Sequence, residues 1–259
     1  MTLLAAHDLH VSFGALPAVR GVGFTADAGT LIGLIGPNGA GKTSLIRALA
    51  DLVPFTGAVE IDGRASSRFG RRAFARQVAY LAQNQPVHWP FTVSDLVALG
   101  RLPHRAPFQG ASRDDRAAVE RAIALAAVGD LSARRVDALS GGERARVLLA
   151  RALAVQAPIL LVDEPIASLD PYHQIEIMEV LRAYAEAGAL VIAVLHDLTL
   201  AERFCHRLLL LRDGELLADG PPATVLVDDN VQRAYRVAVI HHVHDGQRIT
   251  VPWQRVNAK

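Results

Sequence analysis

Residues 36–43 have the types and the spacing that phosphate chemistry requires. They read Gly-Pro-Asn-Gly-Ala-Gly-Lys-Thr and match the pattern G-x-x-x-x-G-K-[ST] at every fixed position. Glycines leave room for backbone N–H groups to surround phosphates, the lysine would reach the β and γ phosphates, and the threonine hydroxyl would serve as a ligand for Mg²⁺. The segment predicts a nucleoside triphosphate site. Its predicted contacts are Gly36, Pro37, Asn38, Gly39, Ala40, Gly41, Lys42, Thr43 and Ser44.

Two adjacent carboxylates follow a second apolar segment. Residues 159–162 are Ile-Leu-Leu-Val, and Asp163 and Glu164 come directly after them. Sheets of α/β proteins present ligand-binding groups at the carboxyl ends of their strands. Asp163 can therefore hold Mg²⁺, and Glu164 can polarise water for in-line attack on the γ phosphate. Taken alone, a solvated acidic strand end explains the pair equally well, but the glycine-rich segment favours catalysis.

A second pair of glycines precedes a predicted helix. Residues 139–143 read Leu-Ser-Gly-Gly-Glu and run into helix formers over 144–155. The start of a helix offers N–H groups and a positive dipole end to an anion. One bound triphosphate does not need two phosphate-binding helix starts that lie a hundred residues apart. The two helix starts are therefore expected to bind two different triphosphate molecules.

The elements that must position these groups alternate between strand and helix. Strands are predicted at 3–13, 18–25, 31–35, 58–62, 78–82, 159–162 and 190–195. Helices are predicted at 44–50 and 171–186, with Gly188 as a stop. Such alternation is typical of a parallel sheet covered by helices. Asp213-Gly214 and Asp245-Gly246 predict hairpins in the last fifty residues.

A helical insert is predicted at 93–156. Thr92 with Asp95 and Ser112 are its candidate caps, and Gly129 is a candidate stop.

Composition restricts the class of protein without naming its function. The chain has 259 residues, 51% of them hydrophobic, which is enough for a substantial core. A net charge of +1 gives no support to a nucleic-acid partner. The single cysteine, Cys205, is expected to pack in the core of a protein from a reducing compartment. No basic leader and no long apolar run is present, so a cytosolic chain is expected.

With these motifs in order, the chain resembles the ATP-binding subunit of the ABC transporter family. Residues 139–143 resemble the signature segment of that family, and Asp163 and Glu164 resemble its Walker B pair. Gln83 resembles the Q-loop glutamine, His196 the switch histidine, Phe13 the aromatic residue that stacks on adenine, and 167–170, Ala-Ser-Leu-Asp, the D-loop. The sequence departs from the family pattern in two places: Ala145 replaces a common glutamine, and Ile166-Ala167 replaces a pair that often carries a hydroxyl.

The resemblance implies a single ABC ATPase domain over 1–259. Its fold would be an α/β P-loop NTPase (RecA-like) core with an N-terminal antiparallel β region, built from 1–85 and 157–259. An inserted α-helical subdomain, 86–156, would carry the signature. The cofactors would be ATP and Mg²⁺, with Thr43, Gln83 and Asp163 at the metal.

The resemblance also implies a head-to-tail dimer that encloses ATP. Ser140, Gly141, Gly142 and Glu143 of one copy would face the glycine loop of the other, and Asp170 would cross the interface. Glu164, His196 and Gln83 would be catalytic. Ordinary structural uses remain open for three of these residues: Asp170 also suits a helix N-cap, Phe13 a core position, and His196 a turn.

The segment 83–105 indicates which branch of the family the chain resembles. It is similar to importers of iron siderophores, haem and cobalamin, which implies two permease subunits, an extracellular binding protein and a position on the cytoplasmic face of the membrane. Trp89 and Phe91 either line the docking groove or fill the core of the insert. An ATPase of a soluble scaffold that assembles iron–sulfur clusters, and an export ATPase, remain alternatives. His241, His242 and His244 are not assigned as metal ligands.

Overall fold

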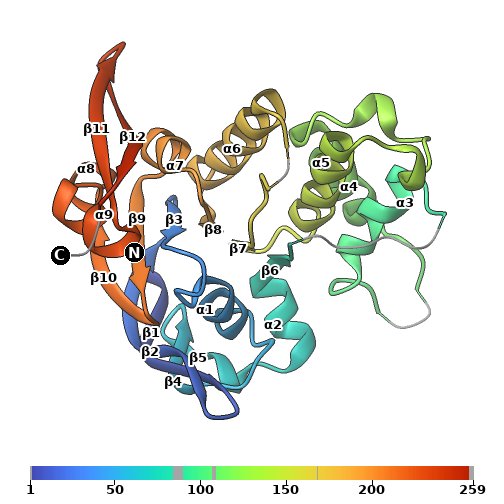
Figure 1. Ribbon diagram of the computed structural model, residues 1–259. Coiled ribbons are helices and arrows are strands. Elements are labelled where there is room, and N and C mark those ends of the chain that lie inside the picture. The colour runs from blue at the N-terminus through green and yellow to red at the C-terminus, as the bar shows by residue number, and fades with distance from the viewer. Residues whose placement is uncertain (1, 84–89, 107–108, 168, 257–259) are drawn as a thin grey trace.

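The computed structural model describes residues 2–83, 90–106, 109–167 and 169–256. Trp89 and Ser168, which the sequence analysis singled out, lie outside these ranges. The described elements form a six-stranded sheet, a four-stranded sheet, a hairpin and the helices around them (Figure 1).

The six-stranded sheet carries the segments that the sequence assigns to chemistry. Its spatial order is β10-β9-β3-β8-β7-β6, with β10 antiparallel and the other five parallel. The strands are β3 (Leu31–Ile35), β6 (Val78–Leu81), β7 (Ile159–Val162), β8 (Leu190–Val194), β9 (Arg207–Arg212) and β10 (Glu215–Gly220). Val162 is paired with both Leu81 and Ala193. The carboxyl ends of β6, β7 and β8 therefore lie level, and so do the residues that follow them.

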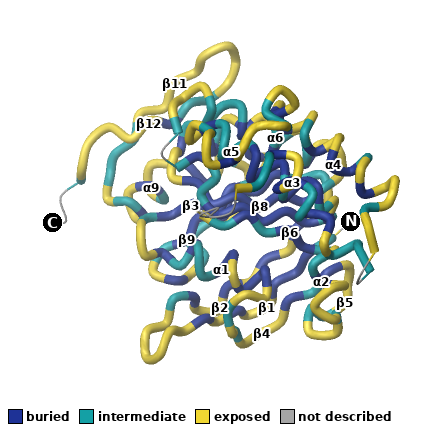
Figure 2. Tube along the Cα trace, turned by 90° about the vertical axis from the view of Figure 1, so that its right-hand side faces the viewer, coloured by how far each residue is buried: buried dark blue, intermediate teal, exposed yellow. Residues whose placement is uncertain are grey.

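Alternate residues of these strands enter two different cores. Leu31 and Ile35 pack in one core, with α3 (Val93–Ala98), α5 (Gly141–Leu153) and the later helices. Ile32 and Leu34 pack in the other core, with α1 (Lys42–Leu49) and the antiparallel sheet. This explains why the strands are apolar at every position, and Figure 2 shows their buried path through the centre of the molecule.

The N-terminal region forms the antiparallel sheet that was expected. Its order is β2-β1-β4-β5, from β1 (Thr2–Phe13), β2 (Leu16–Asp27), β4 (Thr56–Ile61) and β5 (Arg64–Ala65). The 3-10 helix Ser66–Arg68 and α2 (Arg71–Gln77) then lead into β6.

The predicted helical stretch forms α3, α4 (Arg113–Leu125) and α5, joined by the 3-10 helices Leu99–Arg101, Gly129–Leu131 and Val136–Ala138. Thr92 caps α3 by accepting a hydrogen bond from the N–H of Asp95, at 3.2 Å. Ser112 and Asp115 form a capping box on α4.

The prediction of Gly129 as the stop of a helix was wrong. The helix α4 ends at Leu125, and Gly129 begins a 3-10 helix. Ala127 takes the left-handed conformation, with φ 49°, and its carbonyl accepts a hydrogen bond from Arg146 at 2.9 Å. The chain therefore leaves the helix before the glycine is reached.

The C-terminal half contains both predicted hairpins and three helices that were not predicted. Asp213-Gly214 joins β9 to β10, and Asp245-Gly246 joins β11 (Val237–His244) to β12 (Gln247–Arg255). All four turn residues have positive φ, as a two-residue hairpin turn requires. The helix α6 (Pro171–Glu186) was predicted with both ends correct. The remaining helices are α7 (Leu198–Phe204), α8 (Pro222–Val225) and α9 (Asp228–Tyr235).

The histidines of β11 do not form a metal cluster within the described residues. His241 contacts Asp228 of α9 at 2.7 Å, and its other ring nitrogen lies 2.9 Å from both Thr250 and Arg248. The carboxylate partner of His241 comes from α9, a helix that the sequence did not predict.

Candidate nucleotide site

The glycine-rich segment connects β3 to α1, as predicted. Gly36 has φ +150°, and a Cβ there would lie 2.3 Å from the carbonyl oxygen of Leu211. Gly41 has φ +97°, and a Cβ there would lie 2.2 Å from the carbonyl oxygen of Ala18. At both positions a side chain would strain the backbone and overlap a neighbouring strand. The path of this loop therefore depends on glycine.

Lys42 crosses the loop that precedes it. Its ammonium group donates hydrogen bonds to the carbonyls of Gly36, at 2.8 Å, and Pro37, at 3.0 Å. The residue is only 5% exposed, and burial lowers the pKa of the ammonium group, while the charges of Glu164 and Asp163 oppose that shift. The cation is thus desolvated and fixed beside the carboxylates, where it can attract a phosphate.

Asp163 is fully buried and bonded at both carboxylate oxygens. Its Oδ1 accepts a hydrogen bond from the hydroxyl of Thr43, at 3.1 Å, and its Oδ2 accepts one from the phenol of Tyr80, at 3.2 Å. Burial raises the pKa of Asp163, while these two hydrogen bonds and the Arg47 guanidinium oppose the shift. The carboxylate and the Thr43 hydroxyl form a pair of hard oxygen donors, which fits Mg²⁺.

Glu164 follows β7 and contacts residues that follow the two neighbouring strands, β6 and β8. It follows β7 with φ +52°, an uncommon conformation for a glutamate. Its Oε2 accepts a hydrogen bond from the side-chain amide of Gln83, at 2.6 Å, and its Oε1 lies 2.7 Å from Nε2 of His196. Glu164 and His196 also line a cavity of about 140 Å³. The three residues expected to be catalytic are thus in direct contact.

The predicted signature residues lie at the start of α5. The Ser140 hydroxyl accepts from the N–H of Glu143, at 3.3 Å, and the Glu143 carboxylate accepts from the N–H of Ser140, at 2.8 Å. Between described residues, no hydrogen bond or ion pair joins this helix start to the glycine loop. Within one chain, the predicted nucleotide contacts therefore form two separate groups.

The alternatives left open for Phe13 and Asp170 can be examined directly. Phe13 ends β1 with 52% of its surface exposed, so it is not a core residue. Asp170 is the N-cap of α6, accepting a hydrogen bond from the N–H of His173 at 3.0 Å. Phe91 packs against the larger core.

Sequence reasoning missed Tyr80, Arg47 and His173. Tyr80 and Arg47 lie against Asp163, and His173 lies between Asp170 and Gly142. The available signal for Tyr80 was its place in β6, the strand that leads to Gln83. His173 offered none, since its contacts depend on how α5 packs against α6.

Comparison with known proteins identifies the family of the chain. A family model described as "ABC transporter" matches residues 19–167. The chain belongs to the ABC transporter family. As a member it is an ATP-binding ATPase subunit.

Full-length relatives agree with this membership. The hemin import ATP-binding protein HmuV of Streptomyces coelicolor is 42% identical over 255 residues, covering 96% of this ATPase and 90% of the relative. The cobalamin import ATP-binding protein BtuD of Halobacterium salinarum is 45% identical over 215 residues, covering 82% of this ATPase and 54% of that longer relative. A chain from an inward-facing ABC transporter structure is 21% identical, with a TM-score of 0.85 and 98% of both chains covered, and it shares the fold.

Proposed function

We propose that this ATPase powers an importer of an iron siderophore, haem or cobalamin. The observation that carries the proposal is the 42% identity, over almost the whole of both chains, with a hemin import ATP-binding protein. The relative named for cobalamin import supports the same group of large, metal-containing substrates.

The contacts within one chain support a division of labour in hydrolysis. Glu164 is the proposed general base, held between Gln83 and His196 so that its carboxylate faces the cavity. Thr43 and Asp163, with Gln83 nearby, would hold Mg²⁺, which when bound neutralises charge on the phosphates. Lys42 and the N–H groups of the loop bind and orient ATP. Phe13, exposed at the end of β1, would stack on adenine.

A second copy of the chain is proposed to complete the site. Ser140 to Glu143 make no contact with the glycine loop of their own chain in the described residues, so the loop of another copy is their expected target. Two copies arranged head to tail would then enclose two ATP molecules, with Asp170 at the interface. Closure on ATP and reopening after hydrolysis would supply the motion that drives transport.

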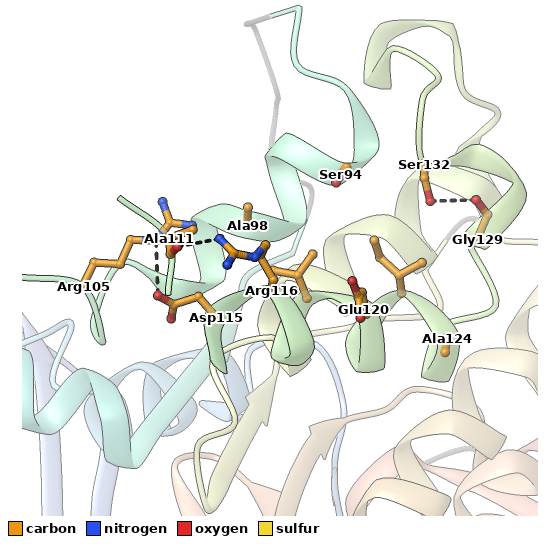
Figure 3. A pocket seen from close by; sticks show the side chains of 12 residues that line it. Ser94, Ala98, Arg105, Ala111, Asp115, Arg116, Glu120, Ala124, Gly129 and Ser132 are labelled. Atoms are coloured by element: carbon orange, nitrogen blue, oxygen red, sulfur yellow. Dashed lines mark hydrogen bonds and ion pairs between the residues drawn. The ribbon is translucent and has the colours of Figure 1, made fainter. Parts of the chain in front are cut away.

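Two permease subunits are the proposed membrane partners, and an extracellular binding protein would act through them. None of the described helices is long and apolar enough to cross a membrane. We propose that this ATPase works at the cytoplasmic face through the permease, with 86–156 as a helical subdomain that meets it. A cavity of about 490 Å³ lies in that region, and α4 contributes Val119 and Ile123 to its lining. Figure 3 shows Arg105, Arg116 and Glu120 among the side chains that line it.

Co-expression with the permease encoded nearest to this chain tests the proposal. The ATPase should co-purify with that permease from detergent-solubilised membranes, and its hydrolysis should rise when the binding protein and its iron chelate, haem or cobalamin are added. Recovery of soluble scaffold proteins alone would overturn the transport function. Stimulation by an unrelated substrate class would overturn the proposed substrates but not the transport function.

A further inference from the structure

The start of α6 touches the signature segment. A Cβ built on Gly142 would lie 2.5 Å from Cδ2 and 2.8 Å from Nε2 of His173. The imidazole ring therefore packs flat against Gly142, one of the two glycines of the signature segment. A second link between the same helices lies one turn further on, where Arg146 and Glu176 form an ion pair at 3.6 Å with most of both side chains buried.

The same imidazole is held by the D-loop aspartate. Nδ1 of His173 lies 2.9 Å from both carboxylate oxygens of Asp170, and the backbone N–H of His173 donates to Oδ1 at 3.0 Å. These hydrogen bonds, the backbone one first, lower the pKa of Asp170, so its carboxylate is an acceptor only. Nδ1 must then carry the proton, which defines the orientation of the ring.

The neighbouring glutamine contacts the backbone that leads to Asp170, at Leu169 and Ile166. The side-chain amide of Gln174 donates to the carbonyl of Leu169 at 3.0 Å and to that of Ile166 at 3.5 Å. The segment that leads to Asp170 is therefore attached to α6 by side chains as well as by the chain itself. His173 is the residue that extends this attachment to α5.

We propose that His173 is a positioning residue that sets Gly142 and Asp170 in one arrangement, so that both segments meet a second copy of the chain as a single surface. The inference rests on the proposed ATP-enclosing dimer. Among the described residues, no hydrogen bond or ion pair joins His173 to the glycine loop of its own chain. Its replacement should therefore spare nucleotide binding by a single chain and weaken the association of two.

Trapping the ATP-bound dimer separates these two effects. In a Glu164→Gln background, which slows hydrolysis, sedimentation velocity measures dimerisation in ATP, and a fluorescent ATP analogue measures binding at concentrations where the chain is monomeric. Adding His173→Ala should raise the chain concentration needed for half-dimerisation about tenfold or more, because misplacing either segment weakens every contact it makes. Monomer affinity for the analogue should stay within about twofold.

Two further variants show whether a loss of dimerisation comes from the contacts of His173. His173→Asn keeps a donor at the place of Nδ1 but lacks the ring atoms that face Gly142, so its dimerisation should lie between that of Glu164→Gln alone and the alanine variant. His10→Ala removes an exposed histidine that contacts Asp8 at 3.0 Å and is the matched control, with no expected effect. Thermal unfolding of each variant identifies one that has lost its fold.

The outcomes distinguish a failure of the proposed role of His173 from a failure of the proposed dimer. If Glu164→Gln alone forms no dimer in ATP, the proposed dimer is wrong. If it dimerises and His173→Ala dimerises equally well, the role of His173 is wrong. Equal loss of dimerisation and of monomer binding also contradicts the inference, since that result describes general damage to the fold.

Discussion

Replacing Tyr80 with phenylalanine removes one hydroxyl from the fully buried Asp163. In the described residues that hydroxyl is the hydrogen-bond donor at Oδ2, and it lies 3.2 Å away. A hydrogen bond to a charged group contributes about 1.5–3 kcal/mol, and a buried acceptor left without its donor loses that amount. The free energy of unfolding should fall by this much, which lowers Tm by roughly 3–6 °C in a chain of 259 residues.

The same change should weaken Mg²⁺ binding. In the described residues the hydroxyl of Thr43 would be the remaining hydrogen-bond donor to Asp163, so the carboxylate can rotate more freely. Loss of a group that orients a metal ligand typically costs about 10-fold or more in metal affinity. Two assays are needed: the Mg²⁺ dependence of ATP hydrolysis, and direct displacement of bound Mn²⁺ by Mg²⁺ in the presence of a non-hydrolysable ATP analogue. The second does not depend on turnover.

Tyr184→Phe is the matched control for Tyr80→Phe. The phenol of Tyr184 donates to the carbonyl of Ala157 at 3.0 Å, and in the described part of the chain no hydrogen bond joins it to the nucleotide site. The variant should therefore lose stability without a change in Mg²⁺ midpoint. An unchanged Mg²⁺ midpoint in Tyr80→Phe would refute the reasoning, whatever happens to its Tm.

Four other changes have defined outcomes. Glu164→Gln should cut turnover by about 10²-fold while ATP binding persists, and equilibrium binding beside steady-state rates would expose an error if turnover were unchanged. Gly41→Ala should abolish ATP binding in a filter assay because its Cβ would overlap the carbonyl of Ala18; normal binding would contradict the loop geometry. Hydrogen bonds from Ser112, with help from Arg101, lower the pKa of Asp115 from 3.8 to about 2. The stabilisation by Asp115 is complete above the pKa of the unfolded chain and is lost as pH falls through the pKa of the folded chain. The free energies of unfolding of wild type and Asp115→Asn, measured in urea, should therefore differ by a constant amount above about pH 4 and converge towards pH 2. A difference that stays constant down to pH 2 would disprove this. Burial raises the pKa of Cys205 to about 12, so its alkylation near pH 8 should follow global unfolding, and fast labelling of the native chain would argue against a buried thiol.

The parts of the fold that sequence predicted best are those with local causes. The boundaries of α6 follow from Asp170, Pro171 and Gly188, and the strand ends from short apolar runs. The helix α9 was missed because its eight residues are mostly polar, and it is stable by packing Val231 and Ala234 into the core. Such packing depends on residues far away in the sequence, so a local sequence pattern does not predict it.

The site shows the same division between local and long-range causes. The glycine loop and the Asp163-Glu164 pair could be found from residue types alone. The meeting of Gln83 and His196 at Glu164 required the strand order, because β6 and β8 flank β7 only in the folded sheet. The contact between His173 and Gly142 joins two helices thirty residues apart, and no spacing rule predicts it.

The dependence of ATPase rate on chain concentration tests the central claim that a second copy completes each site. Below the concentration at which two copies associate, the rate per chain should rise with concentration, because Lys42 and Glu164 lack the Ser140 and Gly142 that a partner supplies. Above it the rate should level off, within a range of roughly three decades. A rate per chain that stays constant across that range, while sedimentation at the same concentrations finds monomers, would contradict the account.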